Sequence, residues 1–155
     1  MIAEKVLGKA GDAAYAGRIT DTLDIEWFNA TKRIDRKMTR NGKELGIRLD
    51  HETSHRGLTR DDVLFDDGSC IIVVDIIPCS CIRIFAKDKI ELARLCYEAG
   101  NRHAPLYYGE SEDEFLTPYE KPMIVLITEL GLSPEKVEAR LLPHKRLSSV
   151  SGHSH

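Results

Sequence analysis

The stretch Cys96-Tyr97-Glu98-Ala99-Gly100-Asn101-Arg102-His103-Ala104-Pro105 predicts the end of an amphipathic helix and the turn that follows it. Asp88 and Glu91 have the spacing of an N-terminal capping box, and Gly100 is expected to supply the left-handed residue that ends the helix. A stripe of apolar residues with nearly helical spacing should face the core: Ile90, Leu92, Ala93, Leu95, Cys96 and Ala99. This helix should therefore hold His103 on a well-fixed turn.

The segments around this helix predict a ferredoxin-like domain. Strands are expected at residues 82–86, 106–109, 114–116 and 136–142. A second helix is expected to begin at Thr117-Pro118-Tyr119-Glu120, with Thr117 as cap and Pro118 in the first position, and to end at Gly131. Pro122 would kink its first turn or mark its true start. The resulting order βαββαβ is the ferredoxin-like plan.

The N-terminal half predicts short strands and turns. Residues 22–27 alternate between apolar and polar, and Asn41-Gly42 and Asp66-Asp67-Gly68 each lie between strand-like segments. No segment before residue 88 has a helical period of useful length. The predicted fold class is α+β with two domains: a small antiparallel β domain, barrel-like or sandwich-like, and a ferredoxin-like domain. The predicted boundaries are 1–77 for the β-rich protein-interaction domain, 78–142 for the metal-binding and dimerisation domain, and 143–155 for a flexible tail.

Composition and charge exclude several classes of function. The 155 residues are 42% hydrophobic and 30% charged, which is typical of a globular protein with a core. A net charge of -3 argues against broad nucleic-acid binding. The chain has no apolar run of membrane-spanning length and no signal-peptide pattern at its start, so we expect a cytoplasmic protein with no membrane partner and with reduced cysteines.

The motif around His103 also resembles a known family. Gly100-Asn101-Arg102-His103, with Tyr97 before it and Ala104-Pro105-Leu106 after it, resembles the signature of the urease accessory protein UreE, the nickel metallochaperone for urease. The resemblance continues through residues 106–111, 114–122 and 130–131, and upstream through 23–28 and 37–49, so that it covers nearly the whole chain in order.

The resemblance implies a metal site and a set of partners. In the family, the residue that matches His103 binds nickel at a dimer interface, and a single imidazole does need further ligands from elsewhere. The implied cargo is Ni(II), with Zn(II) or Cu(II) as alternative occupants because imidazole suits all three ions. The implied partners are a second copy of the chain, as a homodimer or a metal-linked tetramer, and the urease accessory GTPase with the urease apoprotein complex.

The remaining histidines differ in interest. His153 and His155 form a His-x-His pair on the tail and are predicted auxiliary metal ligands, as the family resemblance favours, although a frayed terminus is the alternative. His144 is a secondary candidate, and His51 and His55 are expected to be exposed. Some family members carry a further histidine pair at the start of the second helix, where this chain has Tyr119 and its neighbours.

Cys79-x-Cys81 is open to two interpretations. A soft-metal or redox site is one, but a lone C-x-C lacks a second pair for tetrahedral zinc and is not the C-x-x-C redox spacing. We therefore favour a structural role at the joint between the domains.

No catalytic signature is present in the sequence. Phosphate-binding glycine loops, nucleophile motifs and isolated carboxylate pairs are all missing, and Glu98 is the nearest base that a metal-dependent hydrolase could use beside His103. The predicted function is a non-enzymatic nickel metallochaperone that delivers Ni(II) for urease maturation. The alternative is a peptide-binding or assembly adaptor without a stoichiometric metal.

Overall fold

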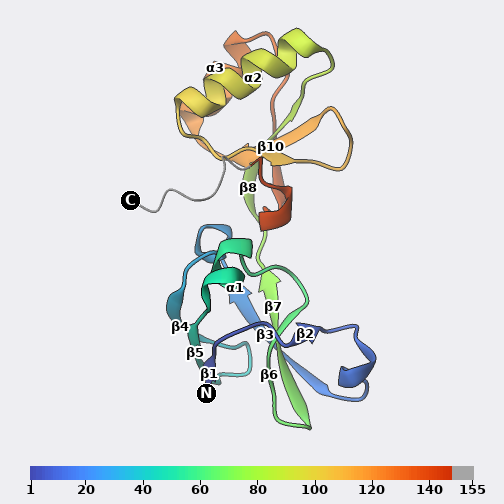
Figure 1. The fold of residues 1–155 in the computed structure, drawn as a ribbon. Helices are drawn as coiled ribbons and strands as arrows, with labels where there is room; N and C mark the ends of the chain where they lie inside the picture. The colour runs from blue at the N-terminus through green and yellow to red at the C-terminus, as the bar shows by residue number, and fades with distance from the viewer. Residues whose placement is uncertain (148–155) are drawn as a thin grey trace. The chain divides into compact units, whose positions relative to one another are not determined.

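The computed structural model describes residues 1–147, and the chain divides into two compact units (Figure 1). Unit 1 holds Met1–Ile77 together with Leu142–His144. Unit 2 holds Pro78–Leu141 and continues from Lys145. Strands dominate both units, and helices accompany them in each, so the predicted two-domain α+β class is confirmed.

Unit 1 is built from two open sheets. Its strands are β1 (Ile2–Ala3), β2 (Gly8–Lys9), β3 (Ile19–Ile25), β4 (Ile34–Met38), β5 (Glu44–Arg48), β6 (Asp62–Asp66) and β7 (Cys70–Ile76), and its helical segments are η1 (Ala13–Tyr15), η2 (Trp27–Asn29) and α1 (His51–Arg56). The sheet orders are β1-β5-β4 and β2-β6-β7-β3. Both predicted hairpins are present, as β4–β5 and β6–β7, and Gly42 takes the positive φ of 81° that the first turn requires.

Two features of unit 1 differ from the prediction. The pairs β3–β7 and β1–β5 are parallel, so the sheets are mixed and not purely antiparallel. Alternation along a strand shows which face is buried, but it carries no information about the direction of a partner that is distant in the sequence. The second difference is the helix α1, whose start is capped by Asp50, with the carboxylate accepting from the Thr53 amide at 2.7 Å. Six residues are too few to show a helical period.

Asp62 is a fully buried carboxylate of unit 1. Apolar side chains from both sheets, among them Leu23, Leu45 and Ile76, form the core, and Leu142 packs against it. Asp62 has a side-chain exposure of 0%, and its oxygens contact Lys9 Nζ and Arg56 Nη2, each at 2.7 Å. One of these oxygens also accepts from the Thr59 amide at 2.9 Å. Every charge-bearing oxygen of Asp62 is thus paired, as a buried carboxylate requires.

Glu26 links the stability of unit 1 to pH. Hydrogen bonds from Lys37 and Asn29 lower the pKa of Glu26 from 4.5 to about 2. A lowered folded-state pKa adds stability that is present above the unfolded value and is lost as pH falls toward the folded value. We therefore expect Glu26→Gln to lower the urea midpoint at pH 7, and the gap from the parent to close between pH 4.5 and about 2. Fluorescence of Trp27, the single tryptophan, follows this unfolding.

The matched control for this pH effect is Glu44→Gln. Glu44 pairs with Arg36 at 3.4 Å, but both side chains are largely exposed, and exposed pairs contribute little. The urea midpoint of Glu44→Gln should stay near that of the parent at pH 7 and also at about pH 2. A gap between Glu26→Gln and the parent that persists unchanged at pH 2 would contradict the assignment to Glu26.

Unit 2 has the predicted ferredoxin-like order. Its elements are β8 (Cys79–Phe85), α2 (Lys89–Asn101), β9 (Tyr107–Tyr108), β10 (Glu114–Pro118), α3 (Lys121–Glu129) and β11 (Glu135–Ala139), followed by η3 (Pro143–Lys145). The sheet is antiparallel with the order β11-β8-β10-β9, which makes β8 a central strand. Both helices lie on the same side of this sheet (Figure 1). Ile82 and Ile84 of β8 pack there with Leu95 and Ile127.

The helices of unit 2 begin partly as predicted. Asp88 caps α2 by accepting from the Glu91 amide at 2.8 Å, which confirms the predicted start. The start predicted at Thr117 is wrong, since Thr117 and Pro118 belong to β10, whereas the alternative that Pro122 marks the true start agrees with a helix that begins at Lys121. Pro122 lies in its first turn, where the missing amide hydrogen costs nothing. Gly131, with φ of 80°, follows the helix as predicted.

Candidate functional site

His103 lies at the C-terminal end of α2, but not in the way the sequence predicts. The helix continues through Gly100 to Asn101, and Gly100 is not among the residues with positive φ. The left-handed residue is His103 itself, with φ of 53°. The prediction that Gly100 ends the helix is therefore wrong. Glycine can also lie inside a helix, so its presence alone does not show where the last turn ends.

The hydrogen bonds at this helix end form a Schellman motif. Ala104 N donates to Ala99 O at 2.9 Å, and His103 N donates to Gly100 O at 3.0 Å. These two bonds place His103 at the C′ position, which is usually glycine because the left-handed conformation costs other residues about 1–2 kcal/mol. In the described residues, Asp61 is the only other non-glycine with positive φ. A strained residue of this kind points to a functional requirement for its side chain.

A pocket of about 400 Å³ opens beside His103. Apolar and small residues form most of it, and Cys96 and Arg146 add polar groups; the remaining lining is Ala99, Gly100, Ala104, Pro105, Leu106 and Leu147. The His103 side chain is exposed to solvent. Leu147 N donates to Leu106 O at 2.8 Å, so the last described residue of the chain is fixed at the wall of this pocket.

Comparison with known proteins identifies the family. The UreE urease accessory protein N-terminal domain matches residues 3–76, and the UreE urease accessory protein C-terminal domain matches residues 79–155. The chain belongs to the UreE family. The urease accessory proteins UreE of two Helicobacter pylori strains, G27 and 26695, are each 42% identical to it over 154 residues, which is 99% of this chain and 90% of theirs. The UreE of Helicobacter bizzozeronii is 39% identical and is covered over 86% of its length.

The described part of this UreE family member offers no complete metal site. Within residues 1–147, no group of three or more His, Cys, Asp or Glu side chains is arranged to hold an ion. His144, in η3, and His51 and His55, in α1, are exposed, the last two as predicted. His153 and His155 lie outside the described residues. His103 is thus an accessible imidazole that needs ligands from elsewhere to bind a transition metal.

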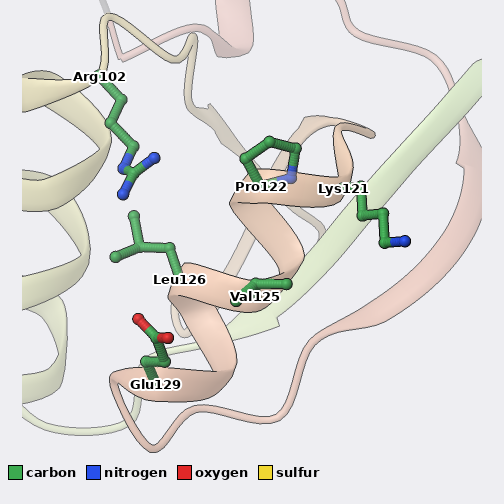
Figure 2. A pocket seen from close by; sticks show the side chains of 6 residues that line it. All are labelled: Arg102, Lys121, Pro122, Val125, Leu126 and Glu129. Atoms are coloured by element: carbon green, nitrogen blue, oxygen red, sulfur yellow. The ribbon is translucent and has the colours of Figure 1, made fainter.

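A second pocket lies between α3 and the end of α2 (Figure 2). This α2–α3 groove has a volume of about 410 Å³ and is lined by Arg102, Lys121, Pro122, Val125, Leu126 and Glu129. The Arg102 side chain reaches over it toward Leu126 (Figure 2). Two of its three charged residues are cations, so the groove is poorly suited to a metal ion, although one of them, Arg102, directly precedes His103 in the chain.

The outer face of α2 in this UreE family member carries exposed apolar residues. Ile90 and Tyr97 are 71% and 69% exposed, and Ala93 lies between them at helical spacing. The predicted stripe is therefore only partly buried, since Leu95 and Ala99 are buried while Ile90, Leu92 and Ala93 are not. The prediction that Ile90, Leu92 and Ala93 face the core is therefore wrong, because helical spacing alone does not show how wide the buried stripe is. The same helix thus presents an uncovered apolar face and, at its end, His103.

Proposed function

We propose that this UreE family member is a nickel metallochaperone for urease maturation, in which the His103 imidazoles of two copies hold one Ni(II) at a dimer interface. The observation that carries the proposal is the position of His103 at C′ of a Schellman motif, exposed beside a pocket. The backbone there is fixed by two hydrogen bonds, while the side chain is free to meet a ligand. The chain has histidine at a position where glycine would relieve the backbone strain, which fits a requirement for the imidazole.

A second copy of the chain is the simplest source of the second imidazole. A two-fold interface uses the same surface patch twice, so a residue near the axis meets its own copy. The exposed apolar face of Ile90, Ala93 and Tyr97 supports such an interface, because large exposed apolar side chains are unfavourable unless they are covered. Metal-linked pairing of dimers into tetramers would use the same imidazoles.

The tail is proposed to supply auxiliary ligands. Leu147 is held at the wall of the His103 pocket, and His153 follows it by six residues. Six residues span up to about 20 Å when extended, so both His153 and His155 are within reach of His103 by chain length. Ligands on a terminal segment can bind the ion and later dissociate from it. Release matters because a delivery protein has to transfer its ion by ligand exchange.

The proposal includes the partners and the roles of the two units. Unit 2 forms the dimer and presents His103, and unit 1 contacts the urease accessory GTPase and the urease apoprotein complex in the cytoplasm. None of the helices in residues 1–147 is both long and apolar enough to span a bilayer. Zn(II) and Cu(II) are expected to compete for the site, since imidazole does not discriminate strongly among these ions.

Calorimetric titration with nickel, with the mass followed by light scattering, tests the proposal. We expect one Ni(II) per dimer for the intact chain and for a chain ending at Ser151, with weaker binding in the shortened chain because His153 and His155 are gone. Titration with Zn(II) before nickel measures the competition. Equal affinities in the two chains would remove the tail from the site, and an absence of saturable nickel binding in both would overturn the metallochaperone proposal in favour of the adaptor.

A further inference from the structure

Two cysteine sulfurs are in contact on the central strand of unit 2. Cys79 and Cys81 are two positions apart on β8, so their side chains project from the same face of the sheet. Their Sγ atoms are 3.6 Å apart, and both thiols are free. This face is opposite to the one on which Ile82 and Ile84 meet the helices. The pair is therefore separate from the main core of unit 2.

The strand geometry disfavours a disulfide between them. Same-face neighbours on a strand have Cα atoms about 6.6–6.8 Å apart, at the upper limit of about 6.8 Å for disulfides. Closing the sulfurs to about 2.05 Å would distort a strand that is paired on both sides, with β10 and with β11. The pair is thus constrained to remain as two adjacent thiols.

An ion between the sulfurs needs much less movement. Metal–thiolate bonds of about 2.3 Å span 3.6 Å in a bent arrangement and up to about 4.6 Å in a collinear one. The Cys79 side chain is only half-buried, so it has room to rotate and change this separation. Cys81 is fully buried, so the ion would enter from the Cys79 side.

The number and type of donors select the ion. Among residues 1–147 no third His, Cys, Asp or Glu joins the pair as a ligand, so tetrahedral zinc and oxygen-seeking cations lack a complete site. Soft thiolates select Cu(I), which accepts two ligands. We propose that Cys79 and Cys81 form a two-coordinate Cu(I) site, separate from the histidine site and with one ion per chain.

Binding at this site has to displace protons. Burial raises the pKa of Cys79, and burial together with the neighbouring Cys79 raises the pKa of Cys81 to about 12, so both groups are thiols at neutral pH. The reaction is Cu(I) plus two thiols giving a bis-thiolate complex of charge -1 and two protons, with no change of oxidation state. The affinity therefore rises with pH. Glu138 lies near enough to raise both thiol pKa values, so it opposes the anionic complex.

Anaerobic competition for Cu(I) against the chelator bathocuproine disulfonate tests this site on the reduced full-length chain. The parent is expected to withdraw one Cu(I) per chain, and Cys79→Ser to bind at least about 100-fold more weakly. Cys81→Ala should show the same loss. A loss below about tenfold in both variants would overturn the proposal. Circular dichroism of each variant checks that the fold is retained, and Cys79→Ser replaces a half-buried side chain with one of similar size.

Matched controls come from the other two cysteines. Cys70 and Cys96 are also partly buried free thiols, so Cys70→Ser and Cys96→Ser should keep the Cu(I) affinity of the parent. Loss of Cu(I) in these controls as well would assign the binding to unspecific thiol chemistry and overturn the site. Nickel titration of Cys79→Ser should match the parent, so the copper site and the nickel proposal can fail independently.

Discussion

Replacing His103 with glycine is expected to weaken nickel binding by about 100-fold or more, because in the proposed dimer the change removes both of the imidazoles that would hold the ion. The same change should leave the metal-free fold as stable as the parent or about 1 kcal/mol more stable. Glycine adopts the left-handed C′ conformation without the cost that a side chain brings there. Calorimetric titration gives the affinity, and thermal unfolding of the metal-free protein gives the stability.

Two further variants make this prediction sharper. His103→Ala removes the imidazole but keeps the backbone strain, so it should lose nickel equally without the gain in stability. His55→Ala removes an exposed imidazole of unit 1 and should keep the nickel affinity of the parent. If the His103→Gly protein bound nickel as tightly as the parent, His103 would not be a ligand. If it unfolded more easily, the imidazole would have a structural role.

Replacing Asp62 with alanine is expected to cost unit 1 about 3 kcal/mol of unfolding free energy, the lower end of the range for broken buried ion pairs. The lower end applies because Lys9 and Arg56 are 47% and 44% exposed and can turn their charges toward solvent. The Thr59 amide, however, loses its acceptor. A loss of this size is a large part of the 5–15 kcal/mol that is typical of a whole domain.

Urea unfolding followed by Trp27 fluorescence measures this loss, since the single tryptophan packs against the core of unit 1. Asp61→Asn is the matched control. Asp61 is the exposed neighbour, with φ of 68°, and asparagine tolerates that conformation, so the unfolding free energy of this variant should stay within about 0.5 kcal/mol of the parent. A small loss for Asp62→Ala would show that the two cations and the amide find other partners.

The sequence was sufficient for features that depend on local chemistry. The Asn41-Gly42 turn, the Asp88 cap and the βαββαβ order follow from short-range rules, and all are present. The parallel pairing of β3 with β7 was missed, because it joins segments separated by about 50 residues. The helix α1 was also missed, since its six residues show no period.

The candidate site was predictable only in part. The resemblance of Gly100-Asn101-Arg102-His103 to the UreE signature singled out His103, and the comparisons established the family, but neither gave the backbone conformation. That conformation depends on where α2 ends, and its left-handed residue lies three positions after the glycine that the sequence rule selects. For Cys79 and Cys81, the i, i+2 spacing fixed a common face, but the contact of the sulfurs came from the structure.

The return of Leu142–His144 to unit 1 affects how the protein can be dissected. Leu142 packs against the unit 1 core, and a side chain at Gly57 would come within 2.9 Å of Pro143. A fragment ending at Ile77 would therefore lack part of its own packing, although it contains every strand of that unit. A single proteolytic cut after Ile77 would leave Leu142 on the C-terminal piece. The two pieces would then be held together non-covalently, through the packing of Leu142 against the unit 1 core. Autonomous expression of the N-terminal region would need this short segment grafted back on.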